Sequence, residues 1–184
     1  MKNTSRQNSI EPQVTAHKNG LKKSSAIDLS NLFVNELKDI YGVEKALVIA
    51  ISKLITNATS NKLVQSLTDH LESTQEHVLR LEDVFLAIGE KVQAKKCEAI
   101  EGLIREAEAI MKNTMKGTAR DEGIILACQK IEHYEIATYG TLCSFARTLG
   151  ENDAAILLQK TLDQEYEEDE QLTEIAEAMQ SEII

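Results

Sequence analysis

The spacing of the apolar residues is the feature of this sequence that most constrains its fold. These residues recur three and four positions apart through four long stretches, at about residues 29–57, 61–88, 118–149 and 152–181, and no proline follows Pro12 to interrupt them. Such spacing places apolar side chains on one face of an α-helix. A β-sandwich or barrel needs turn residues about every 8–12 positions, and this chain lacks them. The pattern therefore predicts an all-α fold built from four long helices.

Residues that favour helix ends occur where the apolar spacing starts or stops. Asp28 is placed to cap the first helix, and Thr118 with Asp121 has the spacing of a capping box for the third. Gly89 and Gly150 follow the second and third stretches, where glycine readily adopts the left-handed conformation that ends helices. These signals support the four helix boundaries.

The connections between the stretches predict how the helices are arranged. The first and second stretches are joined by a short link, and so are the third and fourth. The long connection between the second and third contains the amphipathic segment EAIEGLIREAEAIM, at 98–111. Short links join antiparallel neighbours, and a single long connection is typical of one class of helical bundle. We expect an antiparallel four-helix bundle with an additional helix in the long crossover.

Each apolar face is interrupted near its middle by polar residues, most of them ionisable. At a rise of about 1.5 Å per residue, antiparallel hairpins bring these interruptions to the same height. The interrupting residues, in chain order, are Glu44, His70, Thr74, His77, Glu132, Glu135, Tyr139, Glu165 and Asp169. Buried carboxylates are costly unless they are compensated, and the four faces contain no lysine or arginine. Two interpretations remain open: a dinuclear metal centre, or a hydrated and partly protonated layer that specifies helix pairing.

Charge and composition limit the classes of function. The net charge is −10, although residues 1–26 are basic and rich in Ser, Asn and Lys. We expect residues 1–26 to form a disordered leader and residues 27–184 the folded domain, whose acidity disfavours nucleic-acid binding. The longest apolar run, ALVIAI at 46–51, is far shorter than the ~20 residues of a membrane span. Three cysteines predict reduced thiols and a cytoplasmic location.

Residues 31–180 resemble the YciE/YciF-type stress-response proteins, which are ferritin-like. The resemblance rests on five segments in the same order: DIYGVEKAL (39–47), HLESTQEHVLRLE (70–82), CEAIEGLIREA (97–107), KIEHYEIATYGTL (130–142) and TLDQEYEEDEQL (161–172). It implies a ferritin-like bundle, commonly a homodimer, with a non-haem di-iron or Fe/Mn centre. The implied function is a ferroxidase that uses dioxygen or peroxide and limits oxidative stress.

The resemblance also implies a set of metal ligands for two ions per chain. These ligands are Glu44, His70, Glu132, Glu135, Glu165 and Asp169. Glu44 and Glu135 are expected to bridge the two ions. His77 is a reserve ligand, and whether His70 or His77 binds the metal stays open. Thr74 is expected to hydrogen-bond a bound oxygen species. Tyr139 is expected to be a core residue with a satisfied hydroxyl, and the alternative is that it hydrogen-bonds a ligand or acts as a redox-active phenol.

The sequence departs from the usual di-iron pattern in one respect. That pattern has Glu-x-x-His on two of the four helices, and neither the second nor the fourth stretch contains it. The site would therefore be richer in carboxylate and poorer in imidazole than usual. This departure favours the alternative function, a metal-free stress-response scaffold or interaction module built on the same bundle.

Overall fold

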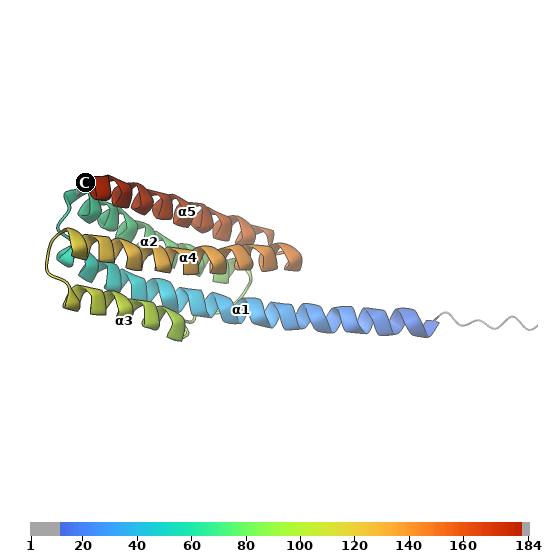
Figure 1. The fold of residues 1–184 in the computed structure, drawn as a ribbon. Helices are drawn as coiled ribbons and strands as arrows, with labels where there is room; N and C mark the ends of the chain where they lie inside the picture. Colours follow the sequence, from blue (N-terminus) through green and yellow to red (C-terminus); the bar gives the residue numbers. More distant parts are fainter. Residues whose placement is uncertain (1–11, 182–184) are drawn as a thin grey trace, which may run out of the picture.

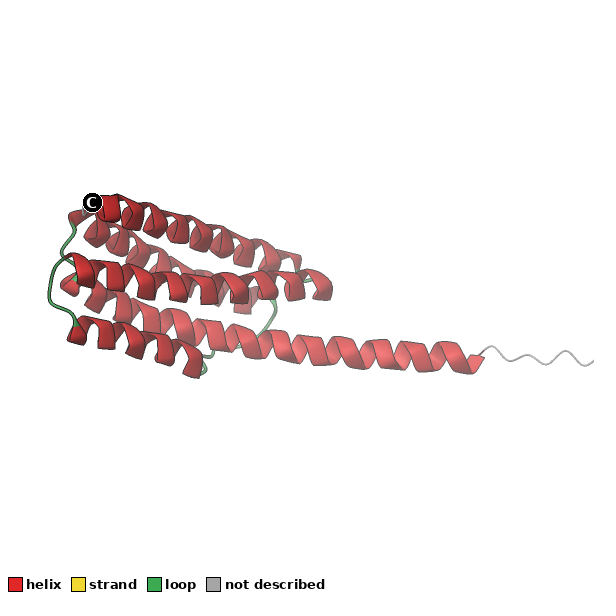
Figure 2. Ribbon diagram, viewed as in Figure 1, coloured by secondary structure: helices red, strands yellow, loops and turns green. Residues whose placement is uncertain are grey.

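The computed structural model describes residues 12–181, with side chains for residues 25–181, and this part of the chain consists of α-helices and the loops that join them. The five helices are α1 (Pro12–Asn57), α2 (Asn61–Ala87), α3 (Glu98–Asn113), α4 (Thr118–Leu149) and α5 (Asn152–Ser181). Figure 2 shows helices joined by loops, with no strand in the described part. The predicted fold class, a ferritin-like bundle with an additional helix in the crossover, is confirmed.

Four of the helices enclose the core. Helix α1 packs against α2 and α4, and α5 packs against the same two helices from the other side. Helix α3 lies outside this arrangement, mainly on α4 and also on α1 (Figure 1). The core is formed by the apolar residues on the predicted faces, such as Leu37, Leu67, Leu142 and Leu158. The described residues contain no helix that is long and apolar enough to cross a membrane.

The start of the first helix was wrongly predicted. Helix α1 begins at Pro12 and runs past the bundle (Figure 1), so Asp28 lies within the helix and does not cap it. Proline is favoured at the first helical position, where its missing N–H costs no hydrogen bond. The expected boundary between leader and domain, at residues 26 and 27, also falls inside α1, and residues 1–11 lie outside the described part.

The predicted capping box of α4 is also wrong. The N-cap of α4 is Gly117, and no side chain bonds there. Asp121 is buried and accepts hydrogen bonds from the backbone N–H and hydroxyl of Thr59 and from the backbone N–H of Ser60. This carboxylate therefore caps the start of α2, a distant element that local spacing could not reveal. The predicted left-handed glycines are confirmed, with φ of 71° at Gly89 and 82° at Gly150.

The long crossover is anchored to α1 close to the polar layer. The backbone N–H of Lys95 donates to the carbonyl oxygen of Lys38 at 2.8 Å. A Cβ atom at Gly42 would collide with the carbonyl oxygen of Lys95. Glycine at position 42 thus allows the crossover to lie against the backbone of α1, two residues before Glu44.

Candidate metal centre

The polar interruptions of the four helices meet inside the bundle. Glu44 from α1, His70 and His77 from α2, Glu132 and Glu135 from α4, and Glu165 from α5 are all buried, with 0–5% of each residue exposed. Thr74 and Tyr139 are buried at the same level. The antiparallel packing of two hairpins therefore produces a shared polar layer between apolar ends.

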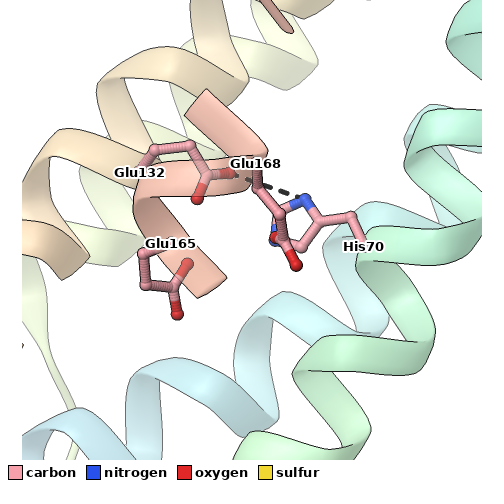
Figure 3. A group of neighbouring side chains, drawn as sticks. All are labelled: His70, Glu132, Glu165 and Glu168. Atoms are coloured by element: carbon pink, nitrogen blue, oxygen red, sulfur yellow. Dashed lines mark ion pairs between the residues drawn. The ribbon is translucent and has the colours of Figure 1, made fainter. Parts of the chain in front are cut away.

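Part of this layer is a group of four side chains that point toward one another: His70, Glu132, Glu165 and Glu168 (Figure 3). One ligand atom from each lies within 4.8 Å of those of the other three. The His70 Nδ1 atom is 3.5 Å from Glu132 Oε1, and its Nε2 atom is 3.1 Å from Glu168 Oε2. Three helices, α2, α4 and α5, supply what we call the first group.

A second group, comprising Glu44, His77 and Glu165, has ligand atoms that also lie within 4.8 Å of one another. The His77 Nδ1 atom is 3.5 Å from Glu44 Oε1 and 3.1 Å from Glu165 Oε1. The Tyr139 hydroxyl donates a hydrogen bond to Glu44 Oε1. Because Glu165 belongs to both groups, the two sets of ligands are adjacent and share one carboxylate.

Three of the residues singled out from the sequence lie differently from the expectation. Asp169 belongs to neither group, and its Oδ2 atom lies 3.2 Å from Nε2 of the exposed His133. Glu135 is fully buried, but neither group includes it. The Thr74 hydroxyl donates to the carbonyl oxygen of His70 within its own helix.

Glu168, which was not among the predicted ligands, belongs to the first group, and the neighbouring Asp169 belongs to neither group. The spacing of Glu165 and Glu168, three residues apart, puts both on one face of a helix. That spacing was the available signal, but Asp169, four residues after Glu165, lies on the same face too, so local spacing alone allowed either residue. Packing of α5 against α2 sets the rotation of the helix, and His70 on α2 is the partner of Glu168.

Burial is the main cause of the raised pKa values of most carboxyl groups in the layer. It raises the pKa of Glu132 and Glu135 well above the usual range, and the negative charge of Glu165 raises both further. Burial and Glu165 together raise the pKa of Glu168 to about 8. Burial acts in the same direction on Glu165, but its hydrogen bond and ion pair with His77 outweigh it and hold the pKa below the usual value.

The two imidazoles are shifted in opposite directions. Burial lowers the pKa of His70 to about 4, so this ring is neutral at pH 7 and able to ligate a metal. Burial would also lower the pKa of His77, but contacts with Glu165 and Glu44 outweigh it and raise the pKa to about 10. In the metal-free protein, a protonated His77 thus supplies positive charge between Glu44 and Glu165.

The layer contains many buried oxygen atoms that lack a hydrogen-bond donor. Both carboxylate oxygens of Glu132 and Glu135 lack one, and so do Oε2 of Glu165 and Oε2 of Glu168. Buried polar atoms are nearly always satisfied in folded proteins. Among residues 25–181, Arg80 is the only buried arginine or lysine, and it bonds Thr161 and Gln164. Carboxylates and imidazoles that converge without a lysine or arginine among them fit divalent cations such as Fe²⁺ and Mn²⁺.

Comparisons with known proteins agree with this architecture. The YciF protein of Escherichia coli (strain K12) is 41% identical over 149 residues, which cover 80% of this chain and 90% of that protein. The solved structure of the E. coli stress protein YciF has a TM-score of 0.81 and covers 83% of this chain and 97% of its own.

Two other solved structures are similar. That of YcfI from Rhodopseudomonas palustris is 40% identical, with a TM-score of 0.76, and covers 79% of this chain and 92% of its own. A protein of Xanthomonas campestris shares the fold, with 24% sequence identity and a TM-score of 0.66. The match covers 82% of this chain and 93% of that protein. Residues 28–183 match the family described as a domain of unknown function, DUF892. The chain therefore belongs to the DUF892 family, as its resemblance to the YciE/YciF-type proteins predicted.

Proposed function

We propose that this protein is a ferritin-like stress protein that binds two Fe²⁺ ions, or Fe and Mn, and oxidises Fe²⁺ with dioxygen or peroxide. The observation that carries the proposal is the pair of buried ligand groups that share Glu165. The stress role is supported by the similarity to the E. coli stress protein YciF. Fe²⁺ that the protein binds and oxidises would no longer react with peroxide elsewhere in the cell.

Charge balance supports two divalent ions. Glu44, Glu132, Glu165 and Glu168 carry four negative charges when ionised, which two divalent cations neutralise. Both groups contain one imidazole and at least two carboxylates, a ligand set that suits Fe²⁺ and Mn²⁺. Bound iron supplies the electrons for reduction of the oxidant, and the protein supplies ligands and a water-poor interior. In this assignment Glu165 would be the one carboxylate that contributes to holding both ions.

The remaining polar residues of the layer have supporting roles. The hydroxyl of Tyr139 orients the Glu44 carboxylate through its hydrogen bond. Glu135 is buried with both oxygens unpartnered, so it is available to hold a proton or to replace another carboxylate ligand. Asp169, expected earlier to be a ligand, is held by His133 at the edge of the site.

Metal content tests the binding step. After aerobic expression in iron-supplemented medium, we expect about two metal ions per chain by plasma mass spectrometry. Glu165→Gln should lose both ions, because both groups use this carboxylate. The matched control is Glu167→Gln, at an exposed position of the same helix, which should retain them. Absence of metal under every supplementation would favour the metal-free scaffold.

Oxidation is tested separately from binding. Fe²⁺ is added to the metal-free protein under anaerobic conditions, and air or peroxide is then admitted while ferric absorption is followed. We expect oxidation well above the rate of Fe²⁺ in buffer, and loss of that acceleration in Glu165→Gln. Tight binding without acceleration would contradict the ferroxidase activity and leave only metal binding. The homodimeric state and cytoplasmic location stay predictions, to be checked by light scattering and cell fractionation.

A further inference from the structure

The two ligand groups differ in how close they lie to solvent. In the second group, the side chains of Glu44, His77 and Glu165 are each only 1% exposed. In the first group, the side chain of His70 is 6% exposed and that of Glu168 is 12% exposed. Through Glu168 the first group therefore reaches the surface, whereas the second group is enclosed.

The groups also differ in how firmly their side chains are held. Glu44 receives the hydroxyl of Tyr139, and the ring of Tyr139 meets the ring of His77 edge-on, with centroids 6.5 Å apart. These contacts fix two of the three side chains in the second group. Unpartnered buried atoms occur in both groups, on Glu132 and Glu168 in the first, on His77 in the second and on the shared Glu165. In the described part of the chain, no tyrosine donates to a side chain of the first group and no aromatic ring pairs with His70. The first group is therefore less constrained as well as closer to solvent.

The surface beside Glu168 is suited to attract a cation. Ser73 on α2 donates a hydrogen bond to Glu168 on α5, so the side chain of Glu168 lies in the seam between these two helices. Asp69 and Glu76 lie four residues before and three residues after Ser73, on the same face of α2, and both are exposed. Glu76 Oε2 is 3.6 Å from Nη2 of Arg80, which balances part of its charge, so Asp69 supplies most of the unpaired negative charge. Negative charge at the entrance of a site raises the local concentration of cations.

We infer that the two groups have different tasks: the first exchanges metal with solvent through the seam between α2 and α5, and the second holds a resident ion. The second group fills through the first, because Glu165 is the carboxylate that both share. This inference rests on the proposed metal binding and adds a direction and an order to it. In a ferroxidase with this arrangement, the ion in the first group is the substrate that turns over.

The order of release tests the inference without any oxidation. The metal-free protein is loaded with Co²⁺, and release to an excess of a strong chelator is followed by stopped-flow absorption. We expect two phases of equal amplitude, the slow one at least about tenfold slower, which corresponds to about 1.4 kcal/mol of additional opening free energy. A single phase that releases both ions would overturn the inference.

Variants assign the phases to the groups. Glu168→Gln should remove the fast phase, leave about one ion in the slow phase and slow the loading of that ion. Glu44→Gln should remove the slow phase and leave the fast one. The reverse assignment, or loading of the second group at an unchanged rate in Glu168→Gln, would contradict entry through the first group.

Two controls keep the result interpretable. Glu167→Gln, on the same helix but exposed, should leave both phases unchanged, and circular dichroism checks that each variant is helical. Asp69→Asn with Glu76→Gln should slow loading severalfold at low salt while the number of bound ions stays the same. A protein that binds no Co²⁺ at all would refute the proposed metal binding, whereas two ions with equal release rates would refute only this inference.

Discussion

The hydroxyl of Tyr139 on α4 donates a hydrogen bond to Oε1 of Glu44 on α1, across the interior of the bundle. Tyr139 is completely buried, and burial together with the charge of Glu44 raises its pKa well above the usual value. The phenol therefore keeps its proton and remains a donor at any physiological pH. It links the two helices at the height of the candidate metal centre.

Replacing this tyrosine should weaken both the fold and the second ligand group. Tyr139→Phe removes the donor and leaves Glu44 Oε1 with only the longer contact to His77 Nδ1 at 3.5 Å. A lost hydrogen bond to a charged acceptor costs about 1.5–3 kcal/mol. Urea unfolding followed by circular dichroism measures the loss of stability, and equilibrium dialysis measures Co²⁺ binding. Tyr166→Phe, at an exposed position on α5, is the control. Equal stability of the two variants would contradict the importance of this hydrogen bond.

The stability of the metal-free protein should fall as the pH rises from about 6.5 to about 10. The pKa of Glu168 is raised to about 8 and that of His77 to about 10, so both bind protons more tightly in the folded than in the unfolded state. A group whose pKa is raised by folding stabilises the protein fully at pH values below its pKa in the unfolded state. This stabilisation is lost as the pH rises through its pKa in the folded state. The pKa of His70 is lowered to about 4, so this residue makes stability rise with pH, but only below about pH 6.5.

This pH dependence is measured by urea unfolding after treatment with a chelator. Glu168→Gln should flatten the fall between pH 6.5 and 8, while the part that depends on His77 remains. Bound metal should remove most of the slope, because it takes the place of the protons. A metal-free protein whose stability rises with pH across this window would show that protons do not compensate the layer.

Substitutions of Asp169 and of Glu165 should have different effects on the number of bound metal ions. Asp169→Asn should retain about two ions per chain, because its carboxylate contacts His133 and belongs to neither ligand group. Glu165→Gln should lose both, because this carboxylate belongs to both ligand groups. Plasma mass spectrometry of the purified proteins makes the comparison. If Asp169→Asn loses one ion, the ligand set inferred from the family resemblance is the better assignment.

Two glycines in helix interiors should respond in opposite ways to alanine. Gly42→Ala should destabilise the protein by about 1–3 kcal/mol, because the new methyl group collides with the backbone of Lys95. Gly140→Ala should stabilise it by up to about 1 kcal/mol, because no atom lies near the added methyl group and alanine favours helices. Thermal unfolding of both variants provides the test. A stabilised Gly42→Ala would contradict the close approach of the crossover.

Much of the architecture follows from local information. The three-and-four spacing of apolar residues depends only on helical geometry, so the bounds of α2, α4 and α5 were predicted almost to the residue. The buried level of Glu44, His70, Glu132 and Glu165 followed from counting residues outward from short links. These inferences hold because the rise per residue is the same in every helix.

The details that sequence reasoning missed depend on contacts between distant segments. Glu168 and Asp169 are adjacent in sequence but about 100° apart around the helix, and only the packing of α5 decides which faces His70. Asp121 fitted a local capping box, yet it bonds Thr59 and Ser60, which lie far away in the chain. In each case a local pattern allowed two geometries, and tertiary packing selected one.

The attachment of the crossover to α1 limits where the length of this loop can change. Residues 90–96 are exposed, whereas Cys97 is buried, and the bond from Lys95 to Lys38 clamps the loop next to the helix. Changes in loop length before Lys95 can therefore be absorbed at the surface. A shift at or after Lys95 would pull on α1 near Glu44, so a segment remote from the chemistry helps set the position of one of its carboxylates.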